Sequence, residues 1–101
     1  MKVHSGYTSS NAEKYIDAAQ PIHLLSTELE KQFEYVDGKR TDNISGYKAW
    51  FSQEGAPAFT VKFANDFKLP KYMALVEFDN LQAIEIRYNV YFKANGLTEV
   101  K

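Results

Sequence analysis

The sequence predicts an all-β or β-rich α+β domain: a small curled sheet or partly open barrel of five to six strands, with one short N-terminal helix. After Pro21, apolar and polar residues alternate with the period of two that indicates half-buried strands. Gly, Pro, Asn and Asp residues divide these segments at short intervals. Helical spacing is confined to the residues before Pro21. A chain of 101 residues supports one core, so we expect an arm and short helix over residues 1–20 and a single barrel-like domain over 21–101.

The helix is expected over residues 10–19. Ser10 and Glu13 have the spacing of a capping box, in which each side chain bonds a free backbone N–H of the first turn. Apolar residues then recur at helical spacing, at Ala12, Tyr15, Ile16 and Ala19. Pro21 disfavours the helical conformation at the residue before it and should end the helix there. Residues 1–9 are expected to form an arm.

The first strand is expected to run from Ile22 to Val36, with a bend near its middle. One parity carries the apolar residues Leu25, Leu29, Phe33 and Tyr35, and the other forms an acidic outer face. The polar loop DGKRTDN (37–43) should follow, with Asp37-Gly38 as its turn. The second strand is expected over 44–53, ISGYKAWFSQ, where Gly46 marks a possible bulge.

The remaining strands are expected at 59–63, 72–78, 83–92 and 97–100, with a loop closed by Pro57 before the first. Segment 65–71 and Asp79-Asn80 should supply turns. Segment 83–92 is predicted to be one strand that buries Ile84, Ile86, Tyr88, Val90 and Phe92. Asn95-Gly96 is typical of a hairpin turn into the last strand. Curling would remove exposed sheet edges, and an oligonucleotide-binding-type barrel is one of several five-stranded solutions.

The only tryptophan lies in GYKAWF (46–51), where Tyr47, Ala49 and Phe51 share one face of an extended strand and Lys48 and Trp50 share the other. If the first face is core, the outward parity of the second, third and fifth strands collects Lys48, Trp50, Thr60, Lys62, Arg87, Tyr91 and Lys93. Loop residues Lys39, Arg40, Lys68 and Lys71 would extend this path. Aromatic faces that stack on bases, next to cations for phosphates, are typical of a single-stranded nucleic-acid groove. The alternative, that the helix 10–19 covers Trp50 and the lysines serve solubility, stays open.

Charge and composition narrow the classes of function. The net charge is −1, yet residues 38–75 hold six basic and three acidic side chains, whereas residues 1–37 hold three basic and six acidic. There is no cysteine and there are two histidines, so no metal site is expected. No nucleophile elbow or glycine-rich phosphate loop is present, and we predict no enzymatic activity, no catalytic residues and no cofactor. Without an apolar membrane segment or secretion signal, a soluble cytoplasmic protein is expected.

Several segments resemble a known family. The order QFEYV, GKRTD, ISGYKAW, VEFDN and YFKANGLTEV, over roughly residues 28–100, is similar to the YdcP-like family of small accessory proteins of Gram-positive conjugative transposons, which are integrative conjugative elements. The segment FDNL (78–81) departs from the family's usual proline after asparagine. The resemblance implies a curled fold of the oligonucleotide-binding kind. It also implies assistance to element transfer or rolling-circle replication, through single-stranded DNA binding beside a helicase or relaxase.

Two hypotheses of function follow, beside the possibility of a structural module. The first is a non-enzymatic, single-stranded DNA-binding accessory protein, whose binding should weaken as salt rises. The second is a protein–protein interaction module, an adaptor or homo-oligomer of a conjugative element or phage, with Trp50 as an interface anchor. The positive middle segment favours the first hypothesis, and the small net charge favours the second. The sequence does not specify the partner, the oligomeric state or a preference between DNA and RNA.

Overall fold

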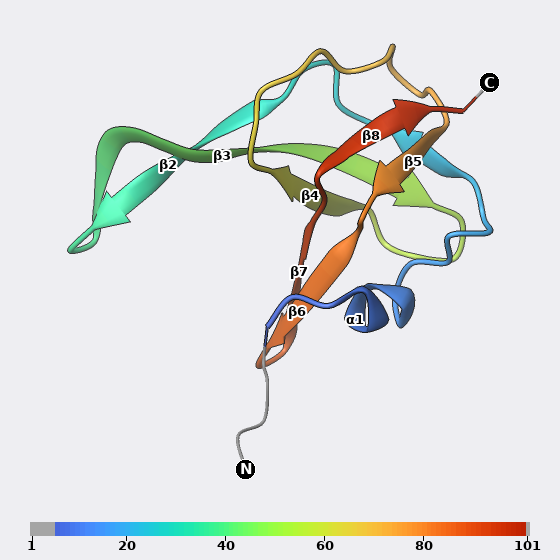
Figure 1. The fold of residues 1–101 in the computed structure, drawn as a ribbon, viewed down its shortest axis with the longest axis horizontal. Helices are drawn as coiled ribbons and strands as arrows, with labels where there is room; N and C mark the ends of the chain where they lie inside the picture. The colour runs from blue at the N-terminus through green and yellow to red at the C-terminus, as the bar shows by residue number, and fades with distance from the viewer. Residues whose placement is uncertain (1–5, 101) are drawn as a thin grey trace.

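The computed structural model describes residues 6–100, which form a β-rich domain with one short helix (Figure 1). A six-stranded mixed sheet has the order β1-β3-β4-β7-β6, with β2 also paired to β3, and a separate two-stranded sheet joins β5 to β8. The predicted β-rich class and curled sheet are confirmed, and across the described residues the strands do not close into a barrel. The first five residues of the expected arm lie outside the described range.

The long central strand β3 (Lys39–Gln53) pairs with β2 (Glu30–Val36), β1 (Ile22–Leu24) and β4 (Phe59–Phe63). Asp37 and Gly38, with φ of 51° and 78°, make the whole β2–β3 turn, so the polar loop predicted over 37–43 is wrong beyond these two residues. Residues 39–43 are strand although they are polar, because this hairpin projects from the body as a ribbon with no core beneath it (Figure 1). The bulge at Gly46 is confirmed, since the β2–β3 register shifts beside it.

The single strand predicted over 22–36 is wrong, because the chain leaves the sheet between β1 and β2. The two strands pair with different segments of β3, and residues 25–29 connect them. The inward residues of β1 are Ile22 and Leu24, which are both buried, and Tyr35 is 66% exposed on the ribbon. The adjacent Leu24 and Leu25 make the period of two ambiguous in the sequence, because either leucine could define the inward parity of the segment.

The single strand predicted over 83–92 is also wrong, since it is the hairpin β6 (Gln82–Ile86) and β7 (Asn89–Lys93). Arg87 begins the two-residue turn with φ of 57°, and Tyr88 at the turn is fully exposed. In a two-residue hairpin the flanking residues face each other, so Ile86 pairs with Asn89. Odd-numbered residues therefore face the core on β6, and even-numbered residues face it on β7. The inward residues are therefore Ala83 on β6 and Phe92 on β7, while Ile84 and Ile86 are not buried.

The second sheet joins β5 (Val76–Asp79) to β8 (Gly96–Glu99) in antiparallel fashion. The strand predicted over 72–78 is therefore shorter, because Met73 (φ 69°) lies in a turn against β1. The expected turn at Asp79-Asn80 is present, and Asn80 has φ of 56°. The predicted Asn95-Gly96 hairpin is wrong, because β8 pairs with β5 and residues 94–95 carry the chain from one sheet to the other. Within the main sheet, β7 lies parallel to β4.

The core lies between the inner face of the main sheet and the layer formed by the second sheet and α1 (Ser9–Glu13). Phe51, fully buried at its centre, has its ring centroid 4.8 Å from that of Phe78 on β5. The helix is shorter than the predicted 10–19, and its N-cap is Thr8, whose Oγ1 accepts a hydrogen bond from the Asn11 N–H at 3.0 Å. The hydrophobic core cluster consists of Ala12, Ile16, Ile22, Leu24, Ala49, Phe51, Phe59, Val61, Phe63, Leu69, Val76, Ala83, Phe92 and Ala94.

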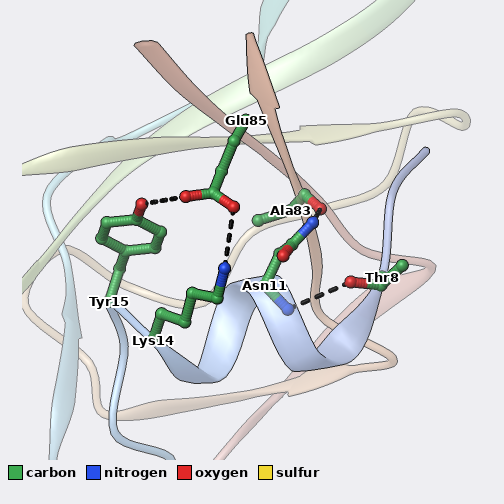
Figure 2. Close-up of polar contacts among 6 residues, drawn as sticks. All are labelled: Thr8, Asn11, Lys14, Tyr15, Ala83 and Glu85. Atoms are coloured by element: carbon green, nitrogen blue, oxygen red, sulfur yellow. Dashed lines mark hydrogen bonds and ion pairs between the residues drawn. The ribbon is translucent and has the colours of Figure 1, made fainter. Parts of the chain in front are cut away.

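α1 is attached to β6 by polar contacts (Figure 2). Asn11 Nδ2 donates to the Ala83 carbonyl at 3.3 Å, Lys14 Nζ lies 2.9 Å from the Glu85 carboxylate, and the Tyr15 hydroxyl donates to the same carboxylate. The hydrogen bond from Tyr15, and then that from Lys14, lowers the pKa of Glu85. The hydrogen bond to Glu85 raises the pKa values of both partners. The short helix is thus tethered to the sheet by charge-assisted bonds as well as by Ala12 and Ile16.

Candidate nucleic-acid interface

Three lysines lie side by side across the outer face of the main sheet, the face away from the core. Lys48 on β3 is the direct partner of Lys62 on β4, and Lys62 is the direct partner of Lys93 on β7. Paired residues project from the same side of a sheet, and neighbouring strands lie about 4.8 Å apart, so the row spans about 10 Å. Gln82 of β6 continues this lysine row at one end, and Glu30 of β2 lies at the other.

The lysine row carries little compensating charge. Like charges directly opposite one another on neighbouring strands destabilise a sheet. Within residues 6–100 the only ion pair joins Lys14 to Glu85, so none of the three row lysines is in a salt bridge there. Glu30 is next to Lys48 in register but is not within ion-pair distance of it. The row is therefore a concentration of positive charge that folding does not require, on a chain whose net charge is −1.

Two aromatic residues flank the lysine row on one side. Trp50 is 42% exposed and lies two residues after Lys48, and Tyr91 is 49% exposed and lies two residues before Lys93. Two residues of strand span about 7 Å, so each ring has a lysine of its own strand at that separation. The Trp50 N–H donates to Ser26 Oγ at 2.8 Å, and its carbonyl accepts from the Leu25 N–H at 2.8 Å, which fixes the backbone beneath the ring.

The helix does not cover Trp50, which answers the question left open by the sequence. Ala12 and Ile16 belong to the core cluster, and the Tyr15 ring meets that of Phe92 edge-on with centroids 6.4 Å apart. Phe92 faces the core, on the side of the sheet opposite to Trp50. The indole is thus exposed because no described segment packs over it fully.

The structure also brings Tyr7, which the sequence pattern does not predict as a site residue, to the same outer face. Thr8 forms a bridge with Ala83 through two hydrogen bonds of 2.9 Å, so Tyr7 lies beside β6. The ammonium of Lys93 lies 4.5 Å from the centroid of the Tyr7 ring. Partial burial, and then the neighbouring Tyr91, raises the pKa of Tyr7, so its hydroxyl remains a neutral donor. A single bridge within a polar segment leaves no periodic pattern that could have predicted this position.

Of the ten residues predicted for the site, the structure brings five together: Lys48, Trp50, Lys62, Tyr91 and Lys93. Arg87 lies in the β6–β7 turn, and Lys39 and Arg40 lie at the end of the β2–β3 ribbon, where the Arg40 guanidinium stands 4.5 Å from the centre of the Phe33 ring. Lys68 lines a pocket with Tyr47 on the core side, and Lys71 lies in the turn beside β1. Arg87, predicted on the outward face of a strand, thus lies in a turn. The four loop residues predicted to extend the path fall on different faces and ends of the domain.

Comparison of the chain with protein-family models, curated proteins and solved structures finds no match. Within residues 6–100, no group of three or more His, Asp or Glu side chains is placed to hold a metal ion. No helix in that part of the chain is long and apolar enough to cross a membrane. The outer face itself presents the exposed rings of Trp50 and Tyr91 and the ammonium groups of the lysine row.

Proposed function

We propose that this protein is a non-enzymatic accessory protein that binds single-stranded DNA on the outer face of its main sheet. The observation that carries the proposal is the register of Lys48, Lys62 and Lys93 on three neighbouring strands, beside the exposed rings of Trp50 and Tyr91. Bases would stack on the rings, and phosphates would lie along the lysine row. Such contacts tolerate any sequence, because every base has an aromatic face.

The biological setting of the proposal comes from the resemblance to conjugative-transposon accessory proteins. In that setting the protein would hold a displaced strand next to a helicase or relaxase during replication or transfer of an element. This part rests on the quoted sequence segments alone. The binding proposal is independent of it, since it rests on the residues of the outer face.

The test is a titration with a dT oligonucleotide at low and at moderate salt. Binding is monitored by the fluorescence of Trp50, the only tryptophan. Quenching should saturate, and the logarithm of affinity should fall with the logarithm of salt with a slope of about −2 for three phosphate contacts. Trp50→Ala, measured by anisotropy of a labelled strand, should weaken binding about 5- to 150-fold, the equivalent of one lost stacking contact. Lys62→Met should reduce the slope by about 0.7.

The matched control is Lys68→Met, which removes the same charge from the core side of the domain. It should leave both the affinity and the salt slope nearly unchanged. Equal effects of Lys62→Met and Lys68→Met would show that binding is non-specific attraction to the whole surface. An absence of any change in Trp50 emission, with no shift of the labelled strand, would refute the proposal.

The alternative function, a protein–protein interaction module, is favoured by a different observation. The β2–β3 ribbon projects from the body (Figure 1) and exposes Tyr35, Val36 and Ile44, and Ile44 is the direct partner of the half-buried Phe33. Exposed apolar residues on a two-stranded ribbon are typical of a surface that a partner covers. Sedimentation equilibrium over a range of concentrations, together with the DNA titration, separates the two functions. Self-association that is lost in Ile44→Lys, with no DNA binding, would favour the alternative.

A further inference from the structure

A pocket of 510 Å³ opens beside the lysine row, on the side away from Trp50 and Tyr91. It lies where β4 ends in Ala64 and Asn65 and where β7 leads into Ala94 and Asn95. Its volume is in the range of small-molecule sites. The polar part of the lining comes from Lys62, Lys93, Tyr7, Ser45, Asn65, Gln82 and Asn95, and none of the described residues that line it is acidic.

Both lysines are directed into this pocket by their surroundings. A Cβ atom at Gly46 would lie only 2.6 Å from Cε of Lys62, so the aliphatic part of Lys62 lies directly over Gly46 and leads toward the pocket. Lys93 is held over the Tyr7 ring at 4.5 Å, and both residues line the pocket. Two ammonium groups, a phenol and three amides thus surround one space. Such a set of donors without a carboxylate suits an anion with several oxygens.

We propose that this pocket binds a phosphate monoester, and that in the protein's proposed function the ligand is the phosphorylated end of a single strand. The inference rests on the proposed function, because a strand with its bases on Trp50 and Tyr91 would have its backbone along the lysine row, from which a terminal phosphate can turn into the adjoining pocket. A terminal phosphate has three free oxygens and a charge of about −1.5 to −2 near neutral pH, whereas an internal diester carries a single charge. The pocket therefore favours a terminal phosphate over an internal one.

The experiment compares dT oligonucleotides of one length that carry a hydroxyl, a 5′-phosphate or a 3′-phosphate, with dTMP and inorganic phosphate as free sources of the same group. Isothermal titration should show one phosphorylated end binding about 10- to 100-fold tighter than the hydroxyl end, as expected for one or two charge-assisted hydrogen bonds. Asn65→Asp, which keeps the side-chain shape but adds a negative charge to the pocket, should abolish that preference and leave hydroxyl-ended binding within about twofold. Asn43→Asp on the exposed β2–β3 ribbon is the matched control, and it should change neither the preference for a phosphorylated end nor the binding of the hydroxyl-ended strand.

The outcomes distinguish a failure of the pocket inference from a failure of the proposed single-strand binding on the outer face. Equal binding of hydroxyl and phosphate ends overturns the pocket inference and leaves the single-strand proposal standing. Tight binding of dTMP and inorganic phosphate, with no binding of any oligonucleotide, overturns the single-strand proposal and assigns the pocket to a free phosphate compound. A preference that survives Asn65→Asp places the phosphate elsewhere and also overturns the pocket inference. Gly46→Ala is a second variant that displaces Lys62 without changing charge, and it should reduce the preference as well.

Discussion

Replacing Phe92 with alanine should lower the free energy of unfolding by about 3–5 kcal/mol, whereas the same change at Tyr88 should lower it by less than about 0.5 kcal/mol. The two aromatics have the same parity in segment 83–92, so an uninterrupted strand would place both in the core. The hairpin separates them, because Tyr88 lies in the turn and Phe92 lies on β7. The two substitutions therefore test whether residues 83–92 form a hairpin or one uninterrupted strand.

The magnitudes follow from what each ring contacts. Phe92 is 8% exposed, and its ring centroid lies 5.4 Å from that of Phe59 and 6.4 Å from that of Tyr15. Its partner across the hairpin is Ala83, which is fully buried, so small neighbours cannot fill the space that the ring would leave. Tyr88 is 102% exposed, so its removal changes almost no buried area.

Urea unfolding followed by circular dichroism provides the measurement. With an m-value of about 2 kcal/mol/M, Phe92→Ala should move the midpoint down by about 2 M and Tyr88→Ala by less than about 0.25 M. The m-value should stay the same in both variants, which shows that the unfolded state is unchanged. A large loss for Tyr88→Ala, similar to that for Phe92→Ala, would refute the hairpin and restore the single strand.

Three further predictions concern other parts of the fold. Gln53 is buried, and its side-chain amide forms hydrogen bonds with the backbone N–H and carbonyl of Asp17 and with the carbonyl of Gln20. Gln53→Leu leaves these groups unpaired and should lower the free energy of unfolding, measured in urea, by about 2–3 kcal/mol. Arg87 has φ of 57°, so Arg87→Gly should raise the unfolding free energy by about 0.5–1 kcal/mol in the same assay. The lowered pKa of Glu85 means that its contact with α1 stabilises the fold above about pH 4.3 and is lost as pH falls through the folded-state pKa. The raised pKa of Tyr15 means that the contact is lost again at high pH, as pH rises through the folded-state pKa of Tyr15. An NMR pH titration of the α1 amides should show the acid step and the alkaline step in the native chain and neither step in Glu85→Gln.

Each of these has a control with a different expected sign or size. Gln20→Leu changes an exposed side chain next to the same contact and should stay within about 0.5 kcal/mol of the native chain. Asn89→Gly, two residues after Arg87 and within a strand, should destabilise by about 0.5–1 kcal/mol. Glu13→Gln removes an exposed carboxylate from α1 without touching Glu85, so both pH steps should persist. A stabilising Asn89→Gly, or pH steps that vanish in Glu13→Gln, would contradict the assignments made here.

The sequence by itself determined the β-rich class, the short helix near the N-terminus, the strand 59–63 and the two faces of the strand that holds Trp50. These follow from local rules: period two assigns Ala49 and Phe51 to the core and Trp50 to the outside, and Asp37-Gly38 specifies its own turn. The same rules fail where a turn does not interrupt the alternation of apolar and polar residues. Arg87-Tyr88 lacks the residues of a common hairpin turn, so the alternating pattern continues through it and predicts Tyr88 in the core.

Only the tertiary structure decided which strands are neighbours, and that decision creates the candidate site. Lys48, Lys62 and Lys93 are separated by 14 and 31 residues, and nothing local indicates that β4 lies between β3 and β7 with the last pair parallel. Strand pairing is set by which arrangement buries the inner face of the whole sheet, a property of the complete chain and not of any segment. The same pairing brought Tyr7 to the lysine row and placed Arg87, Lys39, Arg40, Lys68 and Lys71 away from it. Residue types thus indicated the chemistry, and the order of strands decided which of them share one surface.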